Sequence, residues 1–496
     1  MELIVLIALI ACTRFAFRSH YLYDIDSVNF ALALDRFDPS AHQPHPPGYF
    51  LYICLGRLSR VLFHDANLAL VVVSIVFSCG AGALIYMFAN NWFGRKAALF
   101  AGLIFLLSPL AWFHGTVALT YIVEAFFSAL TGYLCWLIRN GRTRLIVPAA
   151  IVVGIAAGFR PSSLMLLFPL LAFSLLRSSR RQAWLGILTL GLSLLAWLIP
   201  MTQIAGGGSY LSALGSLWRV APSKATVFNS SPLNSVARAG VIAFSYFLTF
   251  GCAAFLPFRR DLSADRPKTV FTMVWIGPGL LFFTFVFLRF VNSGYLLALS
   301  PPICVWLGFR ASKWYAGLAL PDIGKISLLV AGAAVNMMIL IYAPVYCSYG
   351  EVRRLERELE SLLRVLPGIA APGDTVIVGY DSHFLGYRHA GYYLPRYTTI
   401  QFPEVQLAAG KRAFVMRDRD TRVESRLPLQ GRRFVVFPLP SGDEEYRLYA
   451  EGVRRRFAPG RVRIVSSSGI EFTTGNAADL GVLFPTVMPM AGVAGK

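Results

Sequence analysis

The segment Tyr21–Tyr52 reads YLYDIDSVNFALALDRFDPSAHQPHPPGYFLY and lies between a hydrophobic N-terminal segment and a long series of further hydrophobic segments. Residues 1–346 contain ten acidic residues, and four of them fall in this one segment. The segment also contains His42 and His45, and two consecutive prolines follow His45. Carboxylates held beside a lipid bilayer indicate chemistry at the membrane surface, so this polar segment is the first candidate for a functional site.

The composition is that of a polytopic membrane protein. The chain has 496 residues, of which 56% are apolar and only 15% charged, and its mean hydropathy is +0.58; a soluble domain is seldom this apolar. The net charge of +20 could indicate a nucleic-acid partner, but the basic residues cluster in short loops between hydrophobic segments, as membrane topology requires. Seven cysteines occur without a Cys-x-x-Cys pair, so neither a zinc site nor a disulfide framework is predicted.

A membrane-spanning helix needs about 20 mostly apolar residues. Eleven windows of the chain are candidates for such helices: 1–18, 66–90, 97–113, 119–138, 145–159, 161–176, 183–203, 237–257, 269–289, 295–310 and 325–346. Residues 1–18 are interpreted as the first span because they lack the basic start and the cleavage site of a signal peptide. The segment 48–63 carries Arg57 and Arg60 and is interpreted as an interfacial helix.

Orientation follows from the basic residues of the loops. Alternate loops carry fifteen lysines and arginines, whereas the loops of the opposite side carry seven. The positive-inside rule places the richer set in the cytoplasm. The loop 19–48 and everything after Tyr346 are then predicted to lie outside the cytoplasm.

The composition changes after Tyr346, which predicts a second domain. The fold class expected is therefore an α-helical polytopic membrane protein of about eleven transmembrane helices (1–346) with a small extracytoplasmic α/β domain (347–496). Within that domain, EVRRLERELESLLRVLP predicts an amphipathic helix ended by Pro367, and GDTVIVGYD and RRFVVFPLP predict strands. The residues after about Asp479 are predicted to form a disordered tail.

Asp24 and Asp26 are the candidate catalytic residues. A hydroxyl that attacks an anomeric carbon must lose a proton, and a carboxylate within hydrogen-bonding distance can accept it. Burial at the edge of the membrane would raise the pKa of such a carboxylate toward the range of a useful base. The alternative is that both are solvated loop residues and that Asp26 is the N-cap of a helix starting near Ser27.

His42 and His45 are candidate substrate-binding residues. Prolines restrict the backbone around His45, which would give its imidazole a fixed direction for a phosphate or an acceptor. The alternative is a stiff linker into the interfacial helix. A His/Asp metal site is possible, but the spacing is not diagnostic, so no metal or cofactor is predicted.

Four further residues near the outer ends of the spans are candidates for substrate binding. Glu124 is a carboxylate inside an apolar helix, where such groups usually face a cavity or a partner, and Tyr121 lies one turn before it on the same face. Arg160 and Arg289 lie on the predicted outer side, and arginine matches the geometry of phosphate oxygens. The alternatives are snorkelling for Glu124 and anchoring to lipid headgroups for the two arginines.

The order of these features resembles the GT-C superfamily of polytopic glycosyltransferases, in particular its protein O-mannosyltransferase-like (family 39) and aminoarabinose-transferase-like branches. The resemblance covers residues 1–346 and rests on HPPGYFLYICLGRL, SPLAWFHGTVALTYIVEAFF and LRFVNSGYLLALSPP. Family members carry Asp-Glu-x-x-Tyr-Ala in the first outer loop. Here Asp26–Ala31 reads DSVNFA, so the aspartate is kept while serine and phenylalanine replace the glutamate and the tyrosine.

The resemblance implies an inverting glycosyltransferase that moves a sugar from a polyprenyl-phosphate carrier to an acceptor hydroxyl outside the cytoplasm. Asp26 would be the general base, Glu124 would match an acidic position of the family, and Arg289 would bind the donor phosphate in the region that includes Tyr295. The implied partners are the donor, a lipid, glycan or protein acceptor, and the bilayer. The excess of arginine over lysine favours a bacterial inner membrane.

Two other classes of function stay open at this point. A transporter or flippase of a lipid-linked or small solute would also need many spans, but it would place ionisable groups near the middle of the bilayer. Here the charges lie mostly at the ends of the predicted spans, which favours the enzyme. A non-catalytic assembly or receptor protein would use the C-terminal domain for its partners.

Overall fold

The structure of the chain is a computed structural model. The structure describes residues 1–208, 210–211, 215, 232–256, 265–285, 290–379, 382–401, 404–406, 412–414, 432–437, 462–467 and 470–476.

The chain divides into two compact units. The first, here called the helical unit, contains Met1–His20 and Pro46–Val352, and the second, here called the mixed unit, contains Tyr21–His45 and Arg353–Lys496. This division differs from the predicted boundary after Tyr346, because the acidic loop belongs to the same unit as the C-terminal part of the chain.

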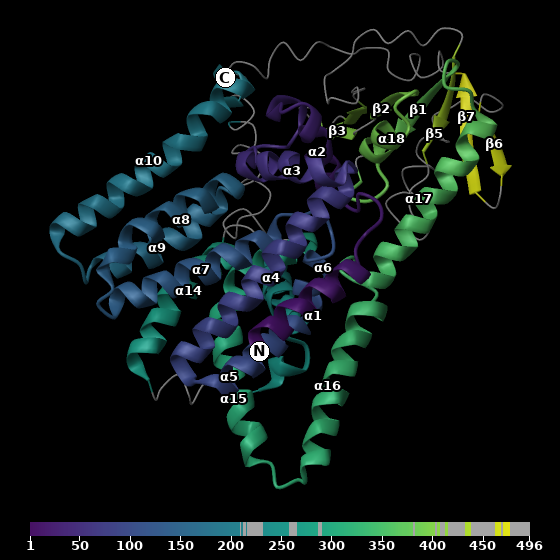
Figure 1. The fold of residues 1–496 in the computed structure, drawn as a ribbon. Helices are drawn as coiled ribbons and strands as arrows, with labels where there is room; N and C mark the ends of the chain where they lie inside the picture. The colour runs from purple at the N-terminus through teal and green to yellow at the C-terminus, as the bar shows by residue number, and fades with distance from the viewer. Residues whose placement is uncertain are drawn as a thin grey trace. The chain divides into compact units, whose positions relative to one another are not determined.

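The described part of the helical unit consists largely of helices (Figure 1). Its α-helices are α1 (Glu2–Ala16), α3 (Phe50–Phe63), α4 (Ala66–Phe93), α5 (Arg95–Leu106), α6 (Pro109–His114), α7 (Tyr121–Arg139), α8 (Ile146–Phe159), α9 (Ser162–Leu175), α10 (Arg180–Ala205), α12 (Pro232–Phe250), α14 (Arg266–Phe285), α15 (Ser300–Gly317) and α16 (Asp322–Tyr342). Three 3₁₀ segments, η2 (Thr143–Leu145), η4 (Gly251–Phe255) and η5 (Phe290–Leu299), lie between them. The long helix α4 is central, since it packs against α1, α3, α5 and α7.

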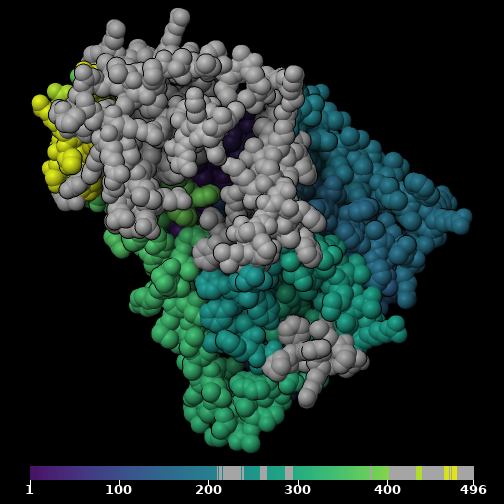
Figure 2. Space-filling view, turned by 180° about the vertical axis from the view of Figure 1, so that it is seen from behind, coloured from purple at the N-terminus to yellow at the C-terminus, as the bar shows by residue number. Residues whose placement is uncertain are grey.

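Each of the eleven predicted windows contains a helix or part of one. Fewer of these helices are both long enough and apolar enough to cross a membrane. Among the described residues, four helices are both long and apolar enough to cross a membrane, namely α4, α7, α10 and α16. The count of eleven therefore stays a prediction. Most of the apolar side chains of α10 and α16 are exposed, and the blue surface in Figure 2, which includes α10, shows such an exposed face.

Prolines and polar caps account for two of the helix breaks. The window 97–113 divides into α5 and α6, because Ser108 caps α6 by accepting a hydrogen bond from the Ala111 amide and Pro109 occupies the first turn. The pair Arg160-Pro161 separates α8 from α9, as the sequence predicts, since proline disfavours helix at the residue before it.

The mixed unit combines two separate parts of the sequence. Its helices are α2 (Ile25–Asp35), η1 (Pro39–Ala41), most of α17 (Tyr349–Ile369) and α18 (Tyr387–Tyr393). Its strands are β1 (Thr375–Gly379), β2 (Thr398–Gln401), β3 (Glu404–Gln406), β4 (Arg412–Phe414), β5 (Arg433–Val436), β6 (Val462–Ser467) and β7 (Ile470–Asn476). The helix α18 packs against α2 and against β1 and β2, so it connects the acidic segment to the sheet.

The main sheet has five strands in the order β2-β1-β5-β7-β6. The strand β1 pairs in parallel with β2 and β5, whereas β7 is antiparallel to both β5 and β6. The apolar run TVIVG of β1 is buried at every position, which suits a strand inside a parallel region. The hairpin β6–β7, yellow in Figure 2, lies at the surface.

These elements confirm the predicted strands at GDTVIVGYD and RRFVVFPLP, which are β1 and β5. The predicted end of the amphipathic helix at Pro367 is wrong, because α17 continues through it to Ile369. The predicted disordered tail after Asp479 lies outside the described residues.

Candidate active site

The first predicted site residues lie at the start of α2, in the mixed unit. Asp24 is the N-cap of this helix, and its carboxylate accepts a hydrogen bond of 2.8 Å from the Asp26 amide. The sequence alone suggested Asp26 as the cap of a helix starting near Ser27, so the cap lies two residues earlier than expected. Consequently the Asp24 carboxylate caps α2, whereas the Asp26 carboxylate does not cap this helix.

Asp26 and His45 form a pair. The Nδ1 atom of His45 lies 3.2 Å from Oδ1 of Asp26, and the two form an ion pair when the imidazole is protonated. The Asp26 side chain is 35% exposed and the His45 side chain is 20% exposed, although Nδ1 of His45 is itself buried. The ring of Phe30 lies 5.8 Å from the imidazole and limits its orientation. This arrangement can accept a proton from a bound hydroxyl and can also contact an anion.

The pKa of Asp24 is perturbed by its surroundings. It is buried, and burial is the main reason why its pKa lies well above the ordinary value. The negative charge of Asp26 raises the pKa of Asp24 further, although the hydrogen bond from the Asp26 amide opposes both effects. Two carboxylates with such different surroundings are suited to different roles.

His42 does not join this pair. It ends η1 with a left-handed backbone conformation (φ 56°) and is exposed. The sequence placed His42 and His45 together as candidates, and the ion pair recorded with Asp26 is made by His45. The left-handed residue directs the chain back toward Gln43, whose backbone amide donates to the Asp38 carbonyl at 2.9 Å.

The segment that carries Asp26 is held by the later part of the mixed unit. The Leu22 amide donates to the Tyr393 hydroxyl at 2.8 Å, and the Ile25 amide donates to the His383 carbonyl at 2.8 Å. These two hydrogen bonds are made immediately before and within the first turn of α2. Local sequence could not predict them, because the partners lie more than 350 residues away along the chain.

A second cluster of predicted residues lies in the helical unit. Arg160, between α8 and α9, forms a buried ion pair with Glu124 of α7, with 3.2 Å between Nε and Oε2. The other carboxylate oxygen of Glu124 accepts hydrogen bonds from Ser162 at 2.7 Å and Ser163 at 3.3 Å. Nη1 of Arg160 donates to the Thr120 hydroxyl at 2.6 Å. The predicted candidates Glu124 and Arg160 therefore contact each other, and neighbouring hydroxyl groups form hydrogen bonds with both.

Aromatic rings surround this ion pair. The guanidinium carbon of Arg160 lies 4.2 Å from the ring centroid of Tyr121 and 4.4 Å from that of Tyr295, both of which were predicted site residues. Tyr49 is a third ring, at 5.8 Å. Cations over aromatic faces gain additional stabilisation where they are shielded from water. The cluster thus unites four of the predicted residues from three separate segments of the sequence.

His114 belongs to the same cluster, and sequence reasoning did not select it. Its ring lies 4.8 Å from that of Tyr121, it is buried, and neither ring nitrogen has a hydrogen-bond partner among the described residues. Gly294 approaches both rings so closely that a Cβ atom there would lie 2.5 Å from Nε2 of His114. The motif FHGTVALTY did contain this histidine, but only its spatial neighbours reveal its environment. Ser162 and Ser163 were likewise missed, although they follow Arg160 directly.

One predicted site residue lies outside the described residues, and the metal site that the sequence left open is not seen within them. Arg289 lies outside them, so its role as a phosphate ligand stays a prediction. Within the described part of the chain, no group of three or more His, Cys, Asp or Glu side chains is arranged to hold a metal ion.

Comparisons with known proteins give the class of fold. The family described as dolichyl-phosphate-mannose-protein mannosyltransferase matches residues 44–203, which is less than half of the chain and includes His45, Glu124 and Arg160. No curated protein matches the chain in sequence. The crystal structure of ArnT from Cupriavidus metallidurans bound to undecaprenyl phosphate is similar with a TM-score of 0.61 at 12% identity, covering 96% of this chain and 98% of that one.

The chain has an ArnT-like fold. The apo structure of the same ArnT agrees, with a TM-score of 0.56, 13% identity and the same coverage. An oligosaccharyltransferase from Archaeoglobus fulgidus is also similar, with a TM-score of 0.45, 14% identity and coverage of 80% of this chain and 63% of that chain. The resemblance to the GT-C superfamily expected from the sequence is thereby confirmed. At these identities the similarity concerns the fold, and the chemistry has to be argued from the residues of this chain.

Proposed function

We propose that this protein is an inverting glycosyltransferase that moves a sugar from a polyprenyl-phosphate carrier to an acceptor hydroxyl. The observation that carries the proposal is the partly exposed Asp26 carboxylate, held 3.2 Å from His45 in a chain with the GT-C fold. A base of this kind is what an acceptor hydroxyl needs when it attacks an anomeric carbon.

The leaving group decides how many acid–base groups the reaction needs. A phosphate leaves as a stable anion and needs no proton from an acid, so a single base can support transfer with inversion. Glycoside hydrolysis differs, since two carboxylates share the work there. We assign the base to Asp26, and we assign Asp24, the buried N-cap, to holding the first turn of α2.

The donor class is supported by the relative and by the matched family. The similar ArnT was crystallised with undecaprenyl phosphate, and the family that matches residues 44–203 is described by a dolichyl-phosphate donor. A donor with a polyprenyl tail would reside in the bilayer, which explains why such an enzyme is built from apolar helices. The acceptor in this proposal is a hydroxyl group of a lipid, a glycan or a protein.

The donor phosphate requires a cation, and the contacts favour some candidates over others. His45 lies beside Asp26, so we assign it a contact with the phosphate or the acceptor. Arg160 already pairs with Glu124 and is enclosed by Tyr121 and Tyr295. We therefore assign Arg160 to positioning these rings, and the predicted phosphate contact of Arg289 is retained.

The reaction is proposed to take place outside the cytoplasm of a bacterial cell, at the inner membrane. The positive-inside distribution of the loops supports this orientation. Enzymes with this placement would build or modify glycans of the cell envelope.

The test is sugar transfer by the Asp26→Asn protein. Cell-envelope glycolipids and glycoproteins from a deletion strain are compared by mass spectrometry with those of strains carrying the wild-type gene or the variant. We expect the deletion to remove one sugar modification, the wild type to restore it, and Asp26→Asn to lower its amount by at least about 100-fold, the lower range for loss of a general base.

Asp322→Asn is the matched control, because Asp322 is also an acidic residue in the first turn of a helix and is exposed in the helical unit. It should restore the modification fully. Wild-type transfer by Asp26→Asn would remove Asp26 from the mechanism. Movement of an intact lipid-linked sugar across vesicles, with the sugar bond unbroken, would instead support a transporter.

A further inference from the structure

A pocket opens in the mixed unit at the opposite end of α2 from Asp26. It has a volume of about 230 Å³ and is lined by Leu32, Asp35, Arg36, Gln43, Tyr392 and Pro395. Sites for drug-sized ligands usually have about 300–1,000 Å³, so this pocket is suited to a group of the size of one sugar. Its lining combines an aromatic ring, a carboxylate, an amide and a guanidinium.

A buried cation lies beside this pocket. Arg388 of α18 is 1% exposed, and it lies one helical turn before the lining residue Tyr392, so the two project from the same side of α18. Nη2 of Arg388 donates to the Ala41 carbonyl at 2.7 Å, and Nε donates to the Tyr387 hydroxyl at 3.2 Å. Nη1 is buried and has no hydrogen-bond partner among the described residues. No carboxylate of the described residues forms an ion pair with Arg388.

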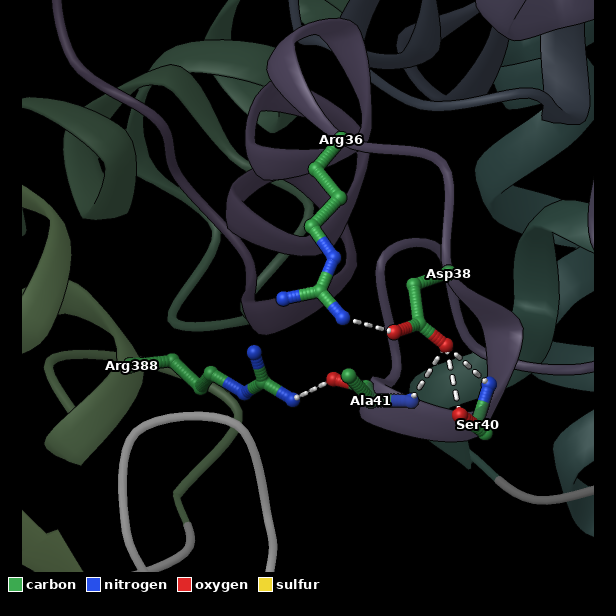
Figure 3. A network of polar contacts seen from close by, with 5 residues as sticks. All are labelled: Arg36, Asp38, Ser40, Ala41 and Arg388. Carbon is green, nitrogen blue, oxygen red and sulfur yellow. Dashed lines mark hydrogen bonds and ion pairs between the residues drawn. The ribbon is translucent and has the colours of Figure 1, made fainter. Parts of the chain in front are cut away.

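Arg36 reaches the same turn from the other side. Its Nη2 donates to Asp38 at 2.7 Å, while Asp38 also accepts from the Ser40 amide and hydroxyl and from the Ala41 amide. Figure 3 shows the guanidinium groups of Arg36 and Arg388 both directed toward the turn formed by Asp38, Ser40 and Ala41. Two arginines thus converge on one short turn, where the Asp38 carboxylate pairs with Arg36.

The charges indicate what the pocket would bind. An isolated buried cation is costly unless an anion or strong acceptors compensate it, and Arg388 has only neutral acceptors among the described residues. A guanidinium presents two parallel donors, which match a carboxylate or a phosphate group. The carboxylate of Asp35 and the amide of Gln43 are groups that bind hydroxyls, and the ring of Tyr392 offers an apolar face.

We propose that this pocket is a binding site for an anionic saccharide, a sugar that carries a carboxylate or a phosphate group, and that it holds the acceptor of the transfer reaction. The second half of this statement depends on the proposed glycosyltransferase function, and the first half does not. The anionic group contacts Arg36 and the Nη1 side of Arg388, while sugar hydroxyls contact Asp35 and Gln43.

The pocket and the proposed base lie on one structural element. Asp26 is in the first turn of α2 and Arg36 follows its last residue, which places them about 15 Å apart along the helix axis. Gln43 of the pocket is two residues from His45. An acceptor of more than one sugar residue could therefore bind its charged end in the pocket and extend along α2 toward Asp26.

Binding is measured on the full-length protein in detergent, by saturation-transfer NMR with glucuronate, glucose 6-phosphate and glucose as probes. We expect the anionic sugars to bind more tightly than glucose, and Arg36→Gln to weaken their binding by about tenfold or more, as expected for loss of one hydrogen bond to a charged group. Arg396→Gln is the matched control, since Arg396 is exposed next to Pro395 and does not line the pocket. It should bind like the wild type.

Arg388→Lys provides a second variant, because it keeps the charge but loses the planar fork; its melting temperature reports whether it folds. Binding of one anionic sugar only would support the proposal and identify the charged group as carboxylate or phosphate. Absence of binding by all probes, or equal binding of all three that Arg36→Gln leaves unchanged, would overturn it.

The two proposals fail in different ways. If Asp26→Asn transfers sugar normally while Arg36→Gln loses binding, the glycosyltransferase mechanism is wrong and the saccharide site stands. If Asp26→Asn loses transfer while Arg36→Gln binds and transfers like the wild type, the site is wrong and the mechanism stands.

Discussion

At the scale of single residues, the two aspartates at the start of α2 show how position decides chemistry. Asp24 and Asp26 are two residues apart and chemically identical, yet one caps the helix in a buried position and the other lies partly exposed beside His45. The sequence could predict that this pair matters, because four of the ten acidic residues before Tyr346 fall in one segment. It could not predict which of the two is the cap, since both are good N-cap residues and the cap depends on where the helix begins.

The raised pKa of Asp24 leads to a prediction about pH. A carboxyl group with a higher pKa in the folded state binds more protons when folded, so its contribution to the free energy of unfolding falls as the pH rises from the ordinary value of 3.8 through the folded value. Asp24→Asn keeps an oxygen that can cap the helix but never carries a charge. We therefore expect the melting temperature of this variant, relative to the wild type, to increase as the pH is raised from 4 to 8.

The measurement is thermal unfolding in detergent across that pH range. Asp24→Ala serves as the comparison, because it removes both the charge and the cap and should lose about 0.5–2 kcal/mol from the cap at every pH. A difference between Asp24→Asn and the wild type that does not vary with pH would contradict a titrating, buried Asp24.

At the scale of elements, the cluster around Arg160 joins α7, the α8–α9 connection and η5. Hydrophobic windows predicted the helices, and a charged residue in an apolar helix indicated that Glu124 and Arg160 have partners. The sequence could not show that they are partners of each other, since 36 positions separate them and either could have contacted a lipid headgroup. His114 was missed for the same reason, because a histidine in an aromatic segment carries no signal until its neighbours are known.

The close approach of η5 to α6 and α7 can be tested at Gly294. A Cβ atom at this position would lie 2.5 Å from Nε2 of His114 and 2.6 Å from Cγ of Tyr121. Gly294→Ala should therefore lower the free energy of unfolding by about 1–3 kcal/mol, as overpacking of a core does. Gly332→Ala in α16 is the matched control, because nothing lies within 4 Å of a Cβ there.

Chemical unfolding in detergent measures both variants. Adding His114→Ala to Gly294→Ala should recover part of the lost stability, since it removes one of the two rings that the methyl group meets. Equal stability of the Gly294 and Gly332 variants would show that η5 is not packed against His114 as described.

At the scale of the whole molecule, the mixed unit is made from two parts of the chain. The amphipathic pattern of α17 and the strands β1 and β5 could be predicted from sequence because their periodicity is local. The inclusion of Tyr21–His45 could not, because it depends on contacts with residues far along the chain, such as the hydrogen bond from the Leu22 amide to the Tyr393 hydroxyl. The sequence showed no recognisable motif in the C-terminal part, whereas in the structure this part supplies hydrogen-bond partners for the backbone of the acidic segment.

Removal of residues 353–496 should therefore abolish sugar transfer, even though Asp26 and His45 remain in the chain. The reason is that Tyr21–His45 would lose the residues that bind its backbone. Because a truncated protein can also misfold as a whole, Tyr393→Phe is the sharper variant: it removes only the hydroxyl that accepts from the Leu22 amide. We expect faster hydrogen exchange at Leu22 and a lower rate of transfer in this variant.

Hydrogen exchange by mass spectrometry and the transfer assay provide the readouts, and Tyr342→Phe, at an exposed tyrosine at the end of α16, is the control. Full activity after deletion of residues 353–496 would show that the C-terminal part is accessory.

The divided origin of the mixed unit also has a consequence for biosynthesis. The ribosome completes Tyr21–His45 about 300 residues before it completes the first residues of the C-terminal part, a delay on the order of 15–60 s at the usual rate of translation. During that interval α2 lacks α18, the helix of the C-terminal part against which it packs. The nascent chain is therefore exposed to proteases and chaperones at Tyr21–His45, the segment that carries the proposed base. Any slowing of translation lengthens that exposure.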